Sequence, residues 1–147
     1  MIIKQLSVFI ENREGRLEQV TEILRNSNIN IVSLSLADTS EYGVFRLIVS
    51  DPEFGKKVLK EAGFSAMLTD VLAVKLPHRI GILNELLETL VESDIGVEYM
   101  YTLATGMNAS IVMKLSDIPK GYQVLKDKNY DYFPAEEVYK INNETTD

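Results

Sequence analysis

Residues 8–31 read VFIENREGRLEQVTEILRNSNINI, and this stretch decides the fold. Before Gly15, apolar residues alternate with their neighbours in the manner of a half-buried strand. After it, the apolar residues recur at the spacing of one helix face. The stretch therefore predicts a strand, a glycine loop, an amphipathic helix over residues 16–26 and a second strand.

The chain repeats this unit 66 positions later, which is the distance from Gly15 to Gly81. Without a gap, the same shift superposes identical residues of the strand, the loop and the helix. These pairs are Val8 and Val74, Arg13 and Arg79, Leu17 and Leu83, Leu24 and Leu90, and Ser27 and Ser93. One supersecondary unit is therefore used twice.

Each repeat is predicted to form strand, helix, strand, strand, helix and strand. In the first repeat, Asp51 and Pro52 favour a helix start, because Asp caps free N–H groups and Pro suits the first helical position. The later elements of the first repeat are expected over residues 29–37, 44–49, 52–62 and 64–68. Those of the second are expected over residues 82–93, 95–103, 109–115 and a helix that ends near Lys128. The offset also predicts an extra strand over residues 137–141.

A βαββαβ unit folds as a four-stranded antiparallel sheet with both helices on one face, because its crossover connections are right-handed. The predicted fold class is thus α+β, with two ferredoxin-like repeats. We expect domains over residues 1–69 and 70–141 and a frayed tail over residues 142–147. The second strand of the first repeat is apolar on both faces and needs a partner. We therefore expect the repeats to pack as an intramolecular pseudo-dimer.

The composition excludes much enzyme chemistry. The chain of 147 residues is 46% apolar, contains no Cys and has one His, His78. It therefore lacks thiolate nucleophiles and Cys-type zinc sites, and we expect no catalytic residue, metal or cofactor. The net charge of −7 opposes nucleic-acid binding. With no membrane span or leader pattern, a cytoplasmic protein is expected.

The chain resembles the ACT domain family from about residue 4 to about residue 141. The resemblance is carried by ENREGRL followed by SNINI in the first repeat, and by PHRIGIL followed by SDIGV in the second. The family pattern is Asp or Asn, any residue, Pro, Gly, any residue, Leu, then a helix and a Gly-Ile-Asn-Ile-like strand. Glu14 and Ile80 depart from it at the Pro position, and His78 at the Asp or Asn position.

The resemblance implies an amino-acid-binding regulatory module with its site at the junction of the repeats. In serine-sensing members of the family, the Asn before the glycine and the Asn that opens the second strand hold the effector. By motif position these are Asn12 and Asn30, whereas the second repeat has His78 and Gly96. The two sites are therefore not equivalent, and the first loop is the stronger candidate.

The candidate ligand-binding residues come from both glycine loops, from the second strand of the first repeat and from one tyrosine. They are Asn12, Arg13, Glu14, Gly15, Arg16, Leu17, Asn30, Ile31, His78, Arg79, Ile80, Gly81, Ile82, Leu83 and Tyr99. A glycine before a helix leaves N–H groups free for a carboxylate, and Asn oxygens suit an ammonium. Several of these residues also have a purely structural explanation. Arg13 and Arg79 are typical solvated loop residues, and Tyr99 fits an interface core.

The leading hypothesis is a regulatory protein that senses an amino acid and acts in trans on a metabolic enzyme or a transport system. The alternative is a ligand-free interaction or assembly module of the same fold, which the altered glycine loops would suit. A small ferredoxin-like enzyme is a third reading. A homodimer of pseudo-dimers stays open as an assembly state.

Overall fold

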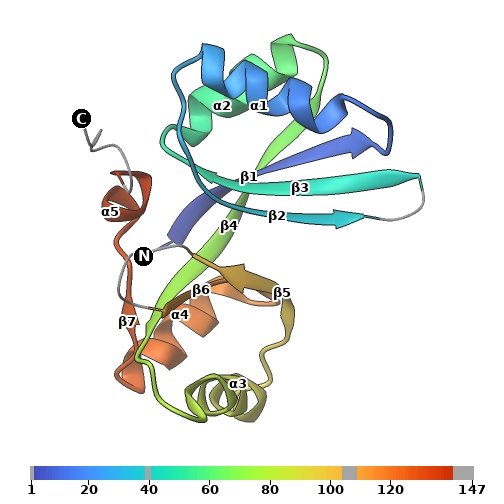
Figure 1. Cartoon of the computed structure of the whole chain (residues 1–147). Helices are drawn as coiled ribbons and strands as arrows, with labels where there is room; N and C mark the ends of the chain where they lie inside the picture. Colours follow the sequence, from blue (N-terminus) through green and yellow to red (C-terminus); the bar gives the residue numbers. More distant parts are fainter. Residues whose placement is uncertain (1, 39–40, 104–108, 141–147) are drawn as a thin grey trace. The chain divides into compact units, whose positions relative to one another are not determined.

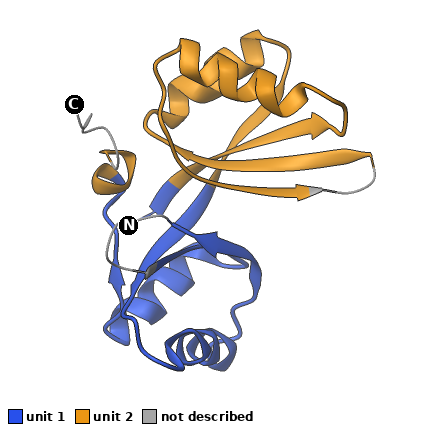
Figure 2. Cartoon of the chain, in the orientation of Figure 1, with its two compact units in different colours: residues 1–3, 70–135 blue, residues 4–69, 136–147 orange. Residues whose placement is uncertain are grey.

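The computed structural model describes residues 2–38, 41–103 and 109–140. The chain divides into two compact units, which Figure 2 shows in separate colours. Unit 1 comprises residues 1–3 and 70–135, and unit 2 comprises residues 4–69 and 136–147. Unit 2 therefore holds the first sequence repeat, and unit 1 holds the second.

Unit 2 is a ferredoxin-like unit whose two helices cover one face of its sheet (Figure 1). Its elements are β1 (Ile2–Glu11), α1 (Arg16–Asn26), β2 (Ile31–Asp38), β3 (Tyr42–Val49), α2 (Pro52–Glu61) and the first part of β4 (Ser65–Leu76). The strands lie in the order β2-β3-β1-β4. The central β3 is antiparallel to both neighbours, with Leu47 opposite Leu6 in β1 and Leu34 in β2.

Unit 1 repeats this plan. Its elements are the second part of β4, α3 (Ile82–Glu92), β5 (Val97–Thr102), β6 (Ala109–Leu115), α4 (Ile118–Asp127) and β7 (Asp131–Tyr132). The strands follow the order β5-β6-β4, and the short β7 pairs with β4 on its other side. The predicted α+β class with two ferredoxin-like repeats is confirmed.

Each unit has its own core between helices and sheet. In unit 2, Val20 and Leu24 of α1 and Leu59 of α2 lie against a strand face that includes Leu6 and Leu47, and all five are fully buried. In unit 1, Leu86 and Leu90 of α3 and Leu125 of α4 pack with Leu72 and Met113 in the same way. The apolar stripes of the sequence thus meet the faces that the 3.6 and 2.0 periodicities predict.

The backbone follows the 66-residue repeat in detail. The left-handed positions recur in three equivalent pairs: Gly15 and Gly81, Asn28 and Asp94, and Gly63 and Asn129. Helix capping recurs as well, because Asp51 Oδ1 accepts from Phe54 N at 3.1 Å and Asp117 Oδ1 accepts from Lys120 N at 3.0 Å. Both units therefore share their turn chemistry as well as their element order.

The second strand of each unit begins two residues later than predicted. Asn28 has φ 58°, and the next N–H, that of Ile29, donates back to Leu24 O at 2.9 Å. The N–H of Ile95 donates to Leu90 O at 2.9 Å in the same way. These bonds close the helix ends in a Schellman-type motif, so Ile29 and Ile95 belong to the cap and not to the strand.

The predicted extra strand over residues 137–141 is wrong. The described part of this segment belongs to the short helix α5 (Ala135–Lys140). Glu136 and Glu137 lie in its first turn and Lys140 in its last, which suits the helix dipole, and only Val138 is buried. The offset alone suggested a strand, but the segment lacks the alternation that a strand needs. Residues 141–147, including the expected frayed tail, lie outside the described residues.

Candidate functional site

The first glycine loop connects β1 to α1 in unit 2. Asn12 N donates to Glu41 O at 2.9 Å, and Arg13 N donates to Glu11 O at 2.8 Å, so the loop is held by backbone bonds. Gly15 is the N-cap of α1, with φ 85° and ψ −8°, and α1 has no side-chain cap hydrogen bond. Arg16 N donates to Arg13 O at 3.3 Å, and no capping side chain satisfies the other N–H groups of the first turn of α1.

A small pocket of about 220 Å³ lies at this loop. All six loop residues predicted for the site line it: Asn12, Arg13, Glu14, Gly15, Arg16 and Leu17. Ile10 and Glu11 of β1, Leu36 of β2 and Gly43 of β3 complete the wall. A Cβ at Gly43 would lie 3.4 Å from Leu36 and Ile10.

The charges at this pocket are mixed. Arg13 Nε lies 3.6 Å from Glu11 Oε2, and both side chains are more than half exposed. Arg16 is held more firmly, because its Nη1 donates to Gln19 Oε1 at 2.9 Å and its guanidinium carbon lies 4.3 Å from the centre of the Phe64 ring. Among the described residues, Arg16 Nε is the one buried side-chain N or O atom with no hydrogen-bond partner.

The three predicted site residues outside the glycine loops line neither of the two described cavities. Asn30 directly precedes β2; its N–H donates to Ser50 Oγ at 2.9 Å, and its carbonyl accepts from Ser50 N at 2.9 Å. Ile31 packs partly buried against the unit 2 core. Tyr99 lies in β5 opposite Lys114. The structure does not bring these residues together with the loop inside either unit.

The second glycine loop has the same backbone but different surroundings. Gly81 is the N-cap of α3 with φ 87°, and a Cβ there would meet nothing within 4 Å. The Ile80 side chain is fully exposed. His78, Gly81 and Leu83 are also exposed, and none of these four residues lines a described cavity.

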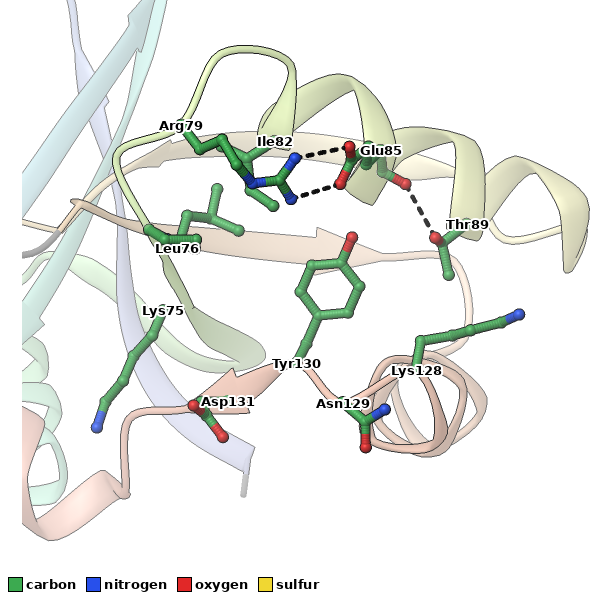
Figure 3. Close-up of a pocket in the computed structure, with 11 residues that line it drawn as sticks. Lys75, Leu76, Arg79, Ile82, Glu85, Thr89, Lys128, Asn129, Tyr130 and Asp131 are labelled. Atoms are coloured by element: carbon green, nitrogen blue, oxygen red, sulfur yellow. Dashed lines mark hydrogen bonds and ion pairs between the residues drawn. The ribbon is translucent and has the colours of Figure 1, made fainter.

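Arg79 of this loop forms a two-point ion pair with Glu85 of α3 (Figure 3). Its Nη1 and Nη2 donate to Glu85 Oε1 and Oε2 at 2.9 and 2.8 Å. These hydrogen bonds raise the pKa of Arg79 and lower the pKa of Glu85. Both groups therefore stay charged around neutral pH.

A larger cleft of about 640 Å³ lies beside this ion pair in unit 1 (Figure 3). Of the predicted site residues, only Arg79 and Ile82 line it. Its other polar residues were not predicted from the sequence; they are Lys75, Glu85, Thr89, Lys128, Asn129, Tyr130 and Asp131. Comparing the two repeats could have identified three of these positions. The first repeat has Ile23, Ala62 and Gly63 where the second has Thr89, Lys128 and Asn129.

The described part of the chain contains neither a metal-binding cluster nor a membrane-spanning helix. Among the described residues, no group of three or more His, Cys, Asp or Glu side chains is placed to hold a metal ion. No helix within the ranges 2–38, 41–103 and 109–140 is long and apolar enough to cross a bilayer.

Comparison with known proteins agrees with the fold and the repeat. A family model described as an ACT domain pair matches residues 1–142, so the chain belongs to the ACT domain pair family. No curated protein matches the chain. A crystal structure of a Bacteroides thetaiotaomicron protein is 40% identical, with a TM-score of 0.90 over 96% of this chain and 98% of that one.

Two further structures share the fold at low sequence identity. The regulatory subunit of aspartate kinase from Thermus thermophilus, in ligand-free form, is 10% identical, with a TM-score of 0.58 over 86% of this chain and 94% of that one. The same subunit from Thermus flavus is 12% identical, with a TM-score of 0.56 over 86% and 94%. These relatives support the ferredoxin-like repeats.

Proposed function

We propose that this ACT domain pair is a non-catalytic regulatory protein that binds a free amino acid at the first glycine loop. One observation carries the proposal. The six motif residues from Asn12 to Leu17 line a single pocket at the uncapped start of α1. The likeness to regulatory subunits of aspartate kinase supports the regulatory role.

The pocket offers a suitable group for each part of an α-amino acid. A carboxylate fits the N–H groups at the start of α1, where the helix dipole also favours negative charge. The side-chain oxygen of Asn12 suits the ammonium, and Leu17 and Leu36 offer apolar contact. The volume of about 220 Å³ is below the roughly 300 to 1,000 Å³ of drug-sized sites, which favours a small effector.

The wider assignments belong to the same proposal. Two ACT modules over residues 1–69 and 70–141 form the regulatory protein, which acts in the cytoplasm on a metabolic enzyme in trans. Asn30, Ile31 and Tyr99 remain candidates by motif position. His78 and the second glycine loop are the weaker candidate, because His78, Ile80, Gly81 and Leu83 are exposed and line neither cavity.

A ligand screen tests the proposal. Thermal denaturation is measured with each of the twenty amino acids in turn. A ligand at about 100 times its dissociation constant should add about 2.7 kcal/mol to the free energy of unfolding. No shift with any amino acid would favour the ligand-free assembly module instead.

Variants then locate the site by calorimetric titration with the best small amino acid. Asn12→Ala should lose about 1.5 to 3 kcal/mol of binding, or roughly tenfold to over a hundredfold in affinity. Gly15→Val should also lose binding, because a β-branched residue disfavours the left-handed backbone. His78→Ala, at the equivalent position of the second loop, is the matched control. Unchanged affinity in both first-loop variants would exclude this loop.

A further inference from the structure

The cleft in unit 1 is lined by polar, charged and aromatic side chains. It lies between α3 and the segment that joins α4 to β7 (Figure 3). Tyr130 projects from this segment toward α3, and Leu76 and Ile82 add apolar wall. The Arg79–Glu85 ion pair borders the same space, and Thr89 lies one turn further along α3.

The first repeat has the same backbone but no such cleft among the cavities described. The positions equivalent to Ile82 and Tyr130 hold Arg16 and Phe64. The Arg16 guanidinium lies over the Phe64 ring at 4.3 Å, whereas Tyr130 in unit 1 lines the cleft. The Arg16 side chain therefore takes the place that the shorter Ile82 leaves open.

The charges of the cleft select the ligand. Arg79 and Glu85 present one guanidinium and one carboxylate side by side. A plain anion that bound Arg79 would leave Glu85 unpaired beside it, and a plain cation that bound Glu85 would face Arg79. A zwitterion satisfies both, with its carboxylate on Arg79 and its ammonium on Glu85. Both side chains are about half exposed, so a bound zwitterion can replace the hydrogen bonds of the pair with its own.

Other charged groups at the cleft do not change this selection. The ammonium of Lys75 lies over the Phe133 ring, 4.7 Å from its centre, and points away from the ion pair (Figure 3). Lys128 and Asp131 carry opposite charges on the segment around Tyr130. The Arg79–Glu85 pair is therefore the charge pattern that a bound molecule meets beside Tyr130.

We propose that this cleft is a second binding site, separate from the first glycine loop, for a free α-amino acid with a large, preferably aromatic, side chain. The main chain of the ligand binds Arg79 and Glu85, and its side chain lies against Tyr130, Leu76 and Ile82. The volume of about 640 Å³ lies within the range of small-molecule sites and well above that of the first-loop pocket. This site does not depend on ligand binding at the first loop.

Three matched ligands test the chemistry by calorimetric titration of the full chain. L-Phenylalanine carries both charges, 3-phenylpropionate lacks the ammonium and phenethylamine lacks the carboxylate. The zwitterion should bind about tenfold or more tightly than either analogue, because each analogue loses a charged hydrogen bond. Equal binding of 3-phenylpropionate, or no binding of phenylalanine, tyrosine or tryptophan at millimolar concentration, would overturn the proposal.

Substitutions test the place. Ile82→Arg installs the residue that the first repeat already has at this position, so the variant should fold, and it should lower phenylalanine affinity by about tenfold or more. Ile82→Leu is the matched control and should bind like the wild type. Glu85→Gln should weaken the binding of phenylalanine but not the binding of 3-phenylpropionate. Asn12→Ala, in the first loop, should leave phenylalanine binding unchanged.

These experiments can exclude the cleft and the first loop independently of each other. If Ile82→Arg remains folded by thermal denaturation and binds phenylalanine like the wild type, the cleft is not the site. If Asn12→Ala abolishes phenylalanine binding, the ligand belongs to the first loop. If the cleft and the first loop are separate sites, Asn12→Ala should lose the binding of small amino acids and keep the binding of phenylalanine.

Discussion

The Arg16 guanidinium lies over the Phe64 ring, with 4.3 Å between the guanidinium carbon and the ring centre. The equivalent pair in the other repeat, Ile82 and Tyr130, lines a cleft instead. Two copies of one backbone thus carry different surfaces because one position holds a long cation in the first repeat and a shorter apolar residue in the second.

The Arg16–Phe64 contact should stabilise unit 2. In a double-mutant cycle of Arg16→Leu and Phe64→Leu, we expect a coupling free energy of about 0.5 to 1 kcal/mol, the range for a partly exposed cation–π pair. Urea unfolding of the wild type, both single variants and the double variant measures it. A cycle with Arg13→Leu and Phe64→Leu is the control, and similar coupling there would contradict a specific contact.

The two loop glycines should resist substitution for a conformational reason. Gly15 and Gly81 have φ 85° and 87°, and a Cβ at either would meet nothing within 4 Å. Changing each to Ala should therefore lower the free energy of unfolding by roughly 1 to 2 kcal/mol through backbone strain alone. Asn tolerates this backbone better, so Gly15→Asn and Gly81→Asn should cost less. Equal losses in the Ala and Asn variants by urea unfolding would show that the backbone is not the cause.

The helix caps should act alike in both repeats. Asp51 and Asp117 accept from the backbone N–H three residues on, at 3.1 and 3.0 Å. Replacing either by Ala should cost about 1 kcal/mol of unfolding free energy, and replacement by Asn should cost little, because Asn also caps. Chemical denaturation of the four variants compares them. A cost confined to one repeat would contradict equivalent capping.

Tyr132 should make stability depend on alkaline pH. Burial, with Tyr122 beside it, raises the pKa of Tyr132 above its usual value of about 10, and its hydroxyl donates to Tyr122 O at 2.8 Å. Because the pKa of Tyr132 is higher in the folded than in the unfolded protein, neutral Tyr132 contributes fully to the free energy of unfolding below pH about 10. This contribution is lost as the pH rises through the pKa of Tyr132 in the folded protein.

Tyr132→Phe tests this dependence. Near neutral pH the variant should be less stable by about 0.5 to 1.5 kcal/mol, because it lacks the hydrogen bond. The difference from the wild type should shrink above pH about 10, where the unfolded wild type ionises. Urea unfolding across this range measures it, and Tyr42→Phe, at an exposed tyrosine, is the control. A constant difference at all pH values would contradict the raised pKa.

The local features of the fold were predictable because each depends on residues close in the chain. The helix over residues 16–26 and the strand over residues 109–115 have the predicted bounds. Gly15 and Gly81 take the left-handed backbone that a tight loop before a helix needs, and Asp51 caps its helix. The clustering of the six residues from Asn12 to Leu17 at one pocket follows from the same short segment.

The sequence by itself thus determined the doubled βαββαβ unit, its glycine loops and its caps. Only the tertiary structure decided that Ile82 and Tyr130 border an open cleft. The physical reason is distance along the chain. A cleft depends on which side chains meet from separate elements, and on whether one long residue, as Arg16 does over Phe64, covers the space between them.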